Sequence, residues 1–194
     1  MKHTYCQAFF IYAMSSYYDA SKDKAALELA LDVFATVEEK CRDDVAYLEA
    51  FSKDWNLIPN DALSENGLMA DKTMNTTLHV MEAYTELYRV SGDKRVLKAL
   101  RFTLEITLDK IYDKNGGKLF VFFDKNLNEI GDIYSYGHDI EATWLIDRAC
   151  DVIGDEHLSK RCAEMNKVIV KNIADRALSN GRLNNEVEHG VVNT

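Results

Sequence analysis

The stretch ATWLIDRACDVIGDEHLSKRCAEM, residues 142–165, decides the fold. Apolar side chains recur every three or four positions on both sides of Gly154, which is the pattern of two amphipathic helices separated by a tight break. Gly154 is expected to end the first helix, and the short polar side chain of Asp155 is expected to cap the start of the second. The stretch therefore predicts a helical hairpin.

The chain repeats this pattern at residues 12–34 (YAMSSYYDASKDKAALELALDVF) and 83–106 (AYTELYRVSGDKRVLKALRFTLEI). Asp23, Asp93 and Asp155 occupy the same place in the three units, 70 and then 62 residues apart. Self-similarity at long spacing is typical of stacked repeats. We expect a single domain over residues 1–194, with repeats at approximately 4–60, 72–134 and 136–194.

A segment of different character follows each second helix. Residues 47–58 (YLEAFSKDWNLI), 117–132 (GKLFVFFDKNLNEIGD) and 177–193 (ALSNGRLNNEVEHGVVN) mix aromatic or β-branched residues with turn formers, which is typical of a short β-hairpin or extended loop. One such unit cannot bury its apolar face alone and must stack on copies of itself. The pattern indicates an all-α protein, built either as an open solenoid or as part of a closed α/α toroid with these loops at its rim.

Composition limits the class of protein. The 194 residues are 47% hydrophobic with a net charge of −9, and their Lys and Arg residues form no stripe, which argues against nucleic-acid binding. No apolar stretch approaches the roughly 18 residues of a membrane span and nothing resembles a signal peptide, so we expect a cytoplasmic protein. The widely spaced Cys6, Cys41, Cys150 and Cys162 are expected to be reduced thiols.

Two His-x-x-Glu pairs stand out as candidate functional residues. In MNTTLHVMEAY (residues 74–84), His79 precedes Glu82 by three residues, and in YGHDIEATW (residues 136–144), His138 precedes Glu141 by three. Residues three apart share one face of a helix. We expect the two pairs to lie at the same end of neighbouring helices, in equivalent repeat positions.

Three chemical interpretations of these pairs are open. A metal site is disfavoured, because His-x-x-Glu supplies only two ligands and the HExxH spacing is absent. General acid/base catalysis suits an imidazole whose tautomer a nearby carboxylate can fix. The third interpretation is two buried histidines with a purely structural role.

Three segments carry a family resemblance: KHTYCQAFFIYA (residues 2–13), MNTTLHVMEAYTELYRV (74–90) and YGHDIEATWL (136–145). Together they resemble the N-acyl-D-glucosamine 2-epimerase family, most closely its cellobiose 2-epimerase branch, over nearly the whole chain. The resemblance implies three helical hairpins of an (α/α)6 toroid and cofactor-independent epimerisation at C2 of a reducing-end glucose, for example cellobiose to glucosylmannose. N-acylglucosamine 2-epimerase and mannose isomerase specificities are the alternatives within the resemblance.

The resemblance also implies roles for six residues. His138 would be one of two acid/base histidines that exchange the C2 proton through an enediolate, with Glu141 orienting the site. His79 and Asn75 would bind or polarise the open-chain carbonyl and neighbouring oxygens. Tyr5 would line the pocket, and Glu186 would contact the sugar.

The extent of the chain raises a second hypothesis. Family members are much longer, so the resemblance predicts the central part of a barrel, lacking a second catalytic histidine and prone to self-association through exposed barrel edges. The competing hypothesis is a non-catalytic helical-hairpin module whose concave face binds a partner. Length favours the module, whereas the motif strings favour a sugar 2-epimerase without metal or cofactor.

Overall fold

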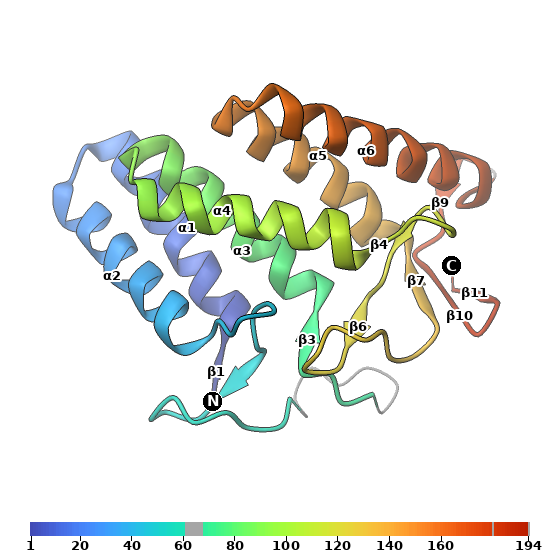
Figure 1. The fold of residues 1–194 in the computed structure, drawn as a ribbon, viewed down its shortest axis with the longest axis horizontal. Helices are drawn as coiled ribbons and strands as arrows, with labels where there is room; N and C mark the ends of the chain where they lie inside the picture. The colour runs from blue at the N-terminus through green and yellow to red at the C-terminus, as the bar shows by residue number, and fades with distance from the viewer. Residues whose placement is uncertain (61–67, 180, 194) are drawn as a thin grey trace.

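The computed structural model describes residues 1–60, 68–179 and 181–193, and these contain three helical hairpins side by side (Figure 1). The hairpins are α1 (Thr4–Ser21) with α2 (Lys24–Lys40), α3 (Met74–Ser91) with α4 (Lys94–Ile106), and α5 (Tyr136–Ile153) with α6 (Glu156–Arg176). A π-helical turn, η1 (Thr107–Ile111), extends α4. The predicted helical hairpins are confirmed.

The turn inside each hairpin is made by two residues: Lys22-Asp23, Gly92-Asp93 and Gly154-Asp155. The first residue has a left-handed conformation, with φ of 60°, 65° and 70° respectively, and its N–H donates to a carbonyl in the preceding helix. The aspartate that follows accepts a backbone N–H from the first turn of the next helix. The predicted caps are confirmed, and in the first hairpin a lysine stands where the other two have glycine.

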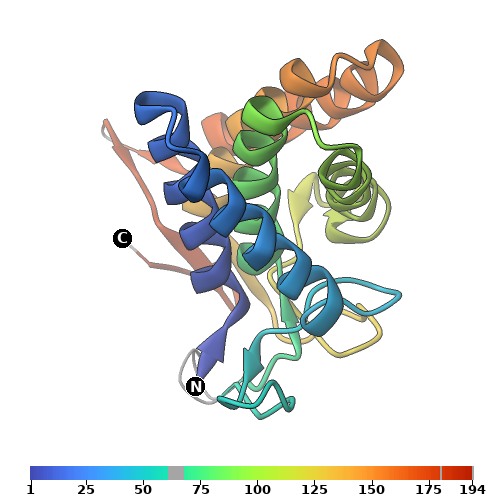
Figure 2. The same ribbon diagram turned by 90° about the vertical axis from the view of Figure 1, so that its left-hand side faces the viewer.

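The helices form two layers. In the inner layer, α1 packs against α3 and α3 packs against α5, while α2, α4 and α6 each cover their own partner from the outer side (Figures 1 and 2). The side chains between the layers form a continuous core, with Ile11, Leu87, Leu100 and Ile146 fully buried. Stacking therefore buries the apolar face that no single hairpin could bury.

Each repeat is closed by a pair of short antiparallel strands. β1 (Lys2–His3) pairs with β2 (Ala50–Phe51), β3 (Lys72–Thr73) pairs with β6 (Phe122–Phe123), and β7 (Ile133–Ser135) pairs with β10 (Glu186–Glu188). The first strand of each pair leads directly into α1, α3 or α5. The predicted extended segments thus pair back to the start of their own repeat, and they gather where the inner helices begin (Figure 1).

Each of the remaining strands pairs with a strand close to it in the sequence. β4 (Tyr112–Asp113) pairs with β5 (Lys118–Leu119), β8 (Leu178–Ser179) with β9 (Arg182–Leu183), and β11 (Val191–Asn193) with β10. No helix within the described ranges is long and apolar enough to cross a membrane.

Candidate functional site

The three inner helices can be compared position by position from their first residues, because each is 18 residues long. Phe9, His79 and Glu141 are the sixth residues of α1, α3 and α5, whereas His138 is the third residue of α5. The expectation that the two histidines occupy equivalent repeat positions is therefore wrong. The two His-x-x-Glu pairs are offset by about one helical turn, so that His79 corresponds to Glu141.

His79 is held between a carboxylate and an aromatic ring. Its Nδ1 lies 3.0 Å from Oε2 of Glu82, and the two side chains are only 12% and 16% exposed. The ring of Phe9 lies 4.6 Å from the imidazole, centroid to centroid, and Phe9 in turn meets Tyr5 edge-on at 6.2 Å. The predicted residues Tyr5 and His79 are thus joined through Phe9.

His138 has a different partner. Its Nδ1 lies 2.8 Å from the hydroxyl oxygen of Ser135, the N-cap of α5, and this oxygen also accepts the His138 backbone N–H at 3.4 Å. Sequence reasoning missed Ser135, although a serine three residues before His138 has the spacing of an N-cap. The cap places the imidazole at the start of α5, where the strands gather.

Glu186 is brought to the same place by the strands. In the β7–β10 pairing it lies opposite Ser135, and the carbonyl of neighbouring Asn185 accepts the backbone N–H groups of Tyr136 and Gly137 at 3.0 and 3.3 Å. Two residues far apart in the sequence, Glu186 and His138, therefore lie at one helix start.

The other two predicted residues lie on the same helices. Asn75 is the second residue of α3 and Glu141 the sixth of α5, and both are partly buried. All six predicted residues therefore belong to the inner helices and to the strand that abuts them.

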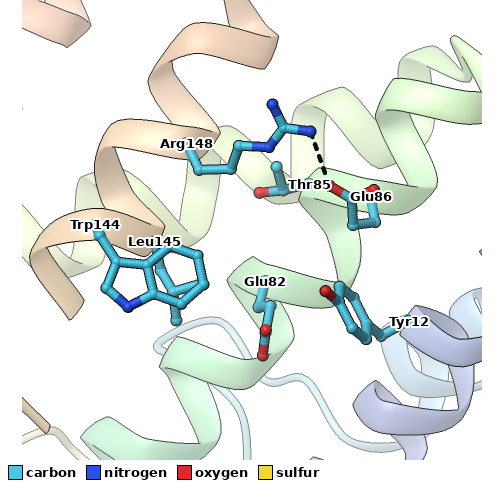
Figure 3. A pocket seen from close by; sticks show the side chains of 7 residues that line it. All are labelled: Tyr12, Glu82, Thr85, Glu86, Trp144, Leu145 and Arg148. Carbon is cyan, nitrogen blue, oxygen red and sulfur yellow. Dashed lines mark hydrogen bonds and ion pairs between the residues drawn. The ribbon is translucent and has the colours of Figure 1, made fainter. Parts of the chain in front are cut away.

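A cavity of about 230 Å³ lies further along the inner helices (Figure 3). The ninth residues of all three helices, Tyr12, Glu82 and Trp144, line it. Burial, and then the carboxylates of Glu82 and Glu86, raise the pKa of Tyr12. Glu82, which lines this cavity, also contacts His79.

A chain of ion pairs crosses the inner layer at this level. Arg148 of α5 lies 3.3 Å from Glu86 of α3, Glu86 pairs with Arg89 at 2.8 Å, and Arg89 reaches Asp19 of α1 at 2.7 Å. The pairs link the three inner helices and occupy the Glu86 carboxylate.

Two buried carboxyl groups anchor the helix starts. Glu49 accepts the backbone N–H and hydroxyl of Thr73 and the hydroxyl of Thr76, and burial raises its pKa to about 7. Asp139 accepts the Leu119 N–H at 3.3 to 3.4 Å, and burial raises its pKa to about 8. These contacts tie the strand-bearing segments to α3 and α5, and thus position Asn75 and His138.

Cys41, Cys150 and Cys162 are buried free thiols and Cys6 is an exposed one. Nowhere in residues 1–60, 68–179 and 181–193 do three His, Cys, Asp or Glu side chains gather in a way that could hold a metal ion.

Comparison with known proteins identifies close relatives. The family model of N-acylglucosamine 2-epimerase matches residues 1–180. A cellobiose 2-epimerase from Ruminococcus albus is 57% identical over 186 residues, which is 96% of this chain and 48% of that protein. The chain spans about half the length of the curated relatives it matches.

Solved structures give the same result. A sugar epimerase from a ruminal bacterium superposes with a TM-score of 0.97 at 54% identity, over 99% of this chain and 49% of that one. The cellobiose 2-epimerase of Bacillus thermoamylovorans gives a TM-score of 0.93 at 39% identity, over 99% of this chain and 50% of that one. The three hairpins of this chain thus correspond to three hairpins of the (α/α)6 toroid of these proteins.

Proposed function

Because this chain belongs to the N-acylglucosamine 2-epimerase family, we propose that it supplies part of the active site of a sugar 2-epimerase. The substrate is the reducing-end glucose of a disaccharide such as cellobiose, as the names of the relatives suggest. The observation that carries the proposal is the pair of imidazoles, His79 and His138, each with a polar partner at Nδ1, on neighbouring inner helices. This arrangement leaves Nε2 of each ring for a substrate.

The proposed chemistry removes a proton from one face of C2 and returns a proton to the other. In the open-chain sugar, His138 takes the C2 proton, and the electron pair of the C–H bond forms the C1–C2 double bond while the carbonyl oxygen becomes an oxyanion. Return of a proton to the opposite face of C2 converts the glucose configuration to that of mannose, and its donor is the second acid/base histidine that the family resemblance implies, which is not among the six predicted residues. Because no electrons are gained or lost, the reaction requires no redox cofactor. An imidazole is suited to this exchange near neutral pH.

The remaining residues bind oxygen atoms in this proposal. Between them, Asn75 and His79 contact the carbonyl oxygen and a neighbouring hydroxyl, and a preorganised donor at the carbonyl oxygen stabilises the charge that develops there. Glu141 orients the site, and Tyr5 and Glu186 contact the sugar from α1 and β10. The burial of His79 favours such a role, because hydrogen bonds strengthen where water is excluded.

Hydrogen exchange at C2 tests the proposed function. The protein is incubated in D2O with cellobiose, N-acetylglucosamine or mannose, and NMR follows deuterium at C2 and the appearance of glucosylmannose. We expect deuterium at C2 of cellobiose. Exchange only in N-acetylglucosamine or mannose would reassign the substrate, and exchange in none of the three would contradict the proposal.

We also propose that the chain self-associates with a second copy. Phe10 and Tyr17, 40% and 53% exposed, form an apolar stripe on α1, at one end of the inner layer. At the other end, Trp144 and Val170 border a groove of about 440 Å³ between α5 and α6. Large exposed apolar residues favour association. We expect light scattering to show a dimer or larger species, and a monodisperse monomer would contradict this.

A further inference from the structure

We propose that Glu82 is a positioning residue that fixes His79 in the tautomer with the proton on Nδ1, so that Nε2 accepts a hydrogen bond from a substrate hydroxyl. This assignment rests on the proposed function for the identity of the ligand, a polyhydroxylated sugar. It assigns a role to Glu82, which the sequence singled out only as the partner of His79 in a His-x-x-Glu pair.

The geometry of the pair is the first argument. Oε2 of Glu82 lies 3.0 Å from Nδ1 of His79, within hydrogen-bonding distance. An ionised carboxylate can only accept a hydrogen bond, so the imidazole must donate. In the neutral ring this places the proton on Nδ1 and leaves a lone pair on Nε2.

The surroundings of Glu82 are the second argument. Of the two carboxylates in the cavity, Glu86 holds Arg148 and Arg89, at 3.3 and 2.8 Å, whereas Glu82 holds His79. Figure 3 shows the Glu82 carboxylate directed away from Arg148. The ion-pair chain therefore leaves Glu82 available to the imidazole.

The packing of the ring is the third argument. Phe9 lies against the His79 ring at 4.6 Å, centroid to centroid, and the His79 side chain is only 12% exposed. A ring flip would break the hydrogen bond to Glu82, whose side chain is only 16% exposed, and an unpaired carboxylate that is largely buried is costly. His79 therefore presents the same nitrogen to the substrate throughout the reaction.

The contrast with His138 defines separate roles. Its Nδ1 partner is the Ser135 hydroxyl at 2.8 Å, and a hydroxyl can both donate and accept. Ser135 therefore stays bonded to His138 in either tautomer and either protonation state. The geometry assigns proton exchange to His138 and fixed recognition of a hydroxyl to His79, leaving the amide of Asn75 as the donor to the carbonyl oxygen.

Imidazole nitrogen NMR tests this assignment without requiring activity. Protein labelled with ¹⁵N-histidine is measured at a pH where the imidazoles are neutral, and His79 is assigned among the five histidines with a His79→Asn variant. We expect a protonated Nδ1 in the wild type and a shift toward the Nε2–H tautomer in Glu82→Ala, whereas the amide oxygen in Glu82→Gln can still accept from Nδ1–H. Glu86→Gln, a change to the neighbouring carboxylate of the cavity, is expected to leave the His79 signals unchanged.

Two results would overturn the proposal: an Nε2–H tautomer of His79 in the wild type, or an unchanged tautomer in folded Glu82→Ala. Kinetics supply the second readout. Loss of a partner that orients a metal-bound imidazole typically costs on the order of 10- to 100-fold in activity, and a fall of the same order is expected for C2 exchange in Glu82→Ala. A fixed tautomer without any exchange would instead refute the proposed function and leave the positioning role of Glu82 intact.

Discussion

Glu49→Gln is expected to make the protein more stable at neutral pH but not in acid. Glu49 is 2% exposed, and its two oxygens accept hydrogen bonds from the Thr73 N–H, the Thr73 hydroxyl and the Thr76 hydroxyl at 2.8 to 3.0 Å. Glutamine has the same shape and keeps one carbonyl oxygen for Thr73, while the Thr76 hydroxyl can rotate to accept from the new amide. The substitution therefore removes a buried charge and leaves the hydrogen bonds largely intact.

The sign follows from the pKa of Glu49. Burial raises it from an ordinary value of 4.5 to about 7. Below pH 4.5 the carboxyl is protonated in both folded and unfolded states, so it adds no pH dependence. Between pH 4.5 and 7 the unfolded chain releases the proton and the folded protein retains it, so the free energy of unfolding falls as pH rises. At about 1.4 kcal/mol per pH unit, the loss reaches roughly 3 kcal/mol above pH 7.

Urea denaturation at several pH values between 4.5 and 8 measures this effect. The difference in unfolding free energy between Glu49→Gln and the wild type is expected to grow in favour of the variant by roughly 3 kcal/mol from the acid to the alkaline end. Glu39→Gln, which removes a 71% exposed carboxylate from α2, is the matched control. A difference for Glu49→Gln that stays constant with pH would refute the reasoning.

Three further substitutions test the fold. Burial raises the Asp139 pKa to about 8, so Asp139→Asn is expected to become more stable than the wild type by several kcal/mol as pH rises from about 4 to 8. Urea titrations measure this difference in unfolding free energy, and a difference that does not change with pH would contradict the reasoning. Lys22→Gly is expected to raise the unfolding free energy by about 1 kcal/mol, since Lys22 has a φ of 60°, and an unchanged or lower value would show that its conformation is not strained. Phe123→Ala is expected to cost about 3–5 kcal/mol, because the ring is fully buried, and a loss under 1 kcal/mol by thermal or urea unfolding would show that the site collapses.

Local signals in the sequence predicted the helical hairpins and their ends. Asp23, Asp93 and Asp155 cap the second helices because a short acceptor side chain suits that position, and Gly92 and Gly154 adopt the left-handed conformation that favours glycine. Lys22 takes the same conformation without such a signal. A lysine is not a residue type that favours this conformation, so no local pattern indicated it there.

The site was harder to predict than the fold. The sequence placed His79 and His138 in equivalent positions because both begin a His-x-x-Glu pair, whereas the helix starts at Met74 and Tyr136 set them one turn apart. The spacing of 62 residues between Asp93 and Asp155 already indicates the offset, since it relates His79 to Glu141 and not to His138. The pairing of Glu186 with Ser135 depends on a strand contact across about fifty residues, which no local pattern specifies.

The most direct test of the account is the rate of hydrogen exchange at C2 of cellobiose in D2O, compared between the wild type, His138→Ala and His157→Ala. His157 lies exposed in the first turn of α6, remote from the strand-bearing ends of the inner helices, and controls for the loss of an imidazole. The account predicts exchange in the wild type and in His157→Ala and its loss in His138→Ala. Equal rates in all three proteins would contradict the assignment of His138 as the group that moves the proton.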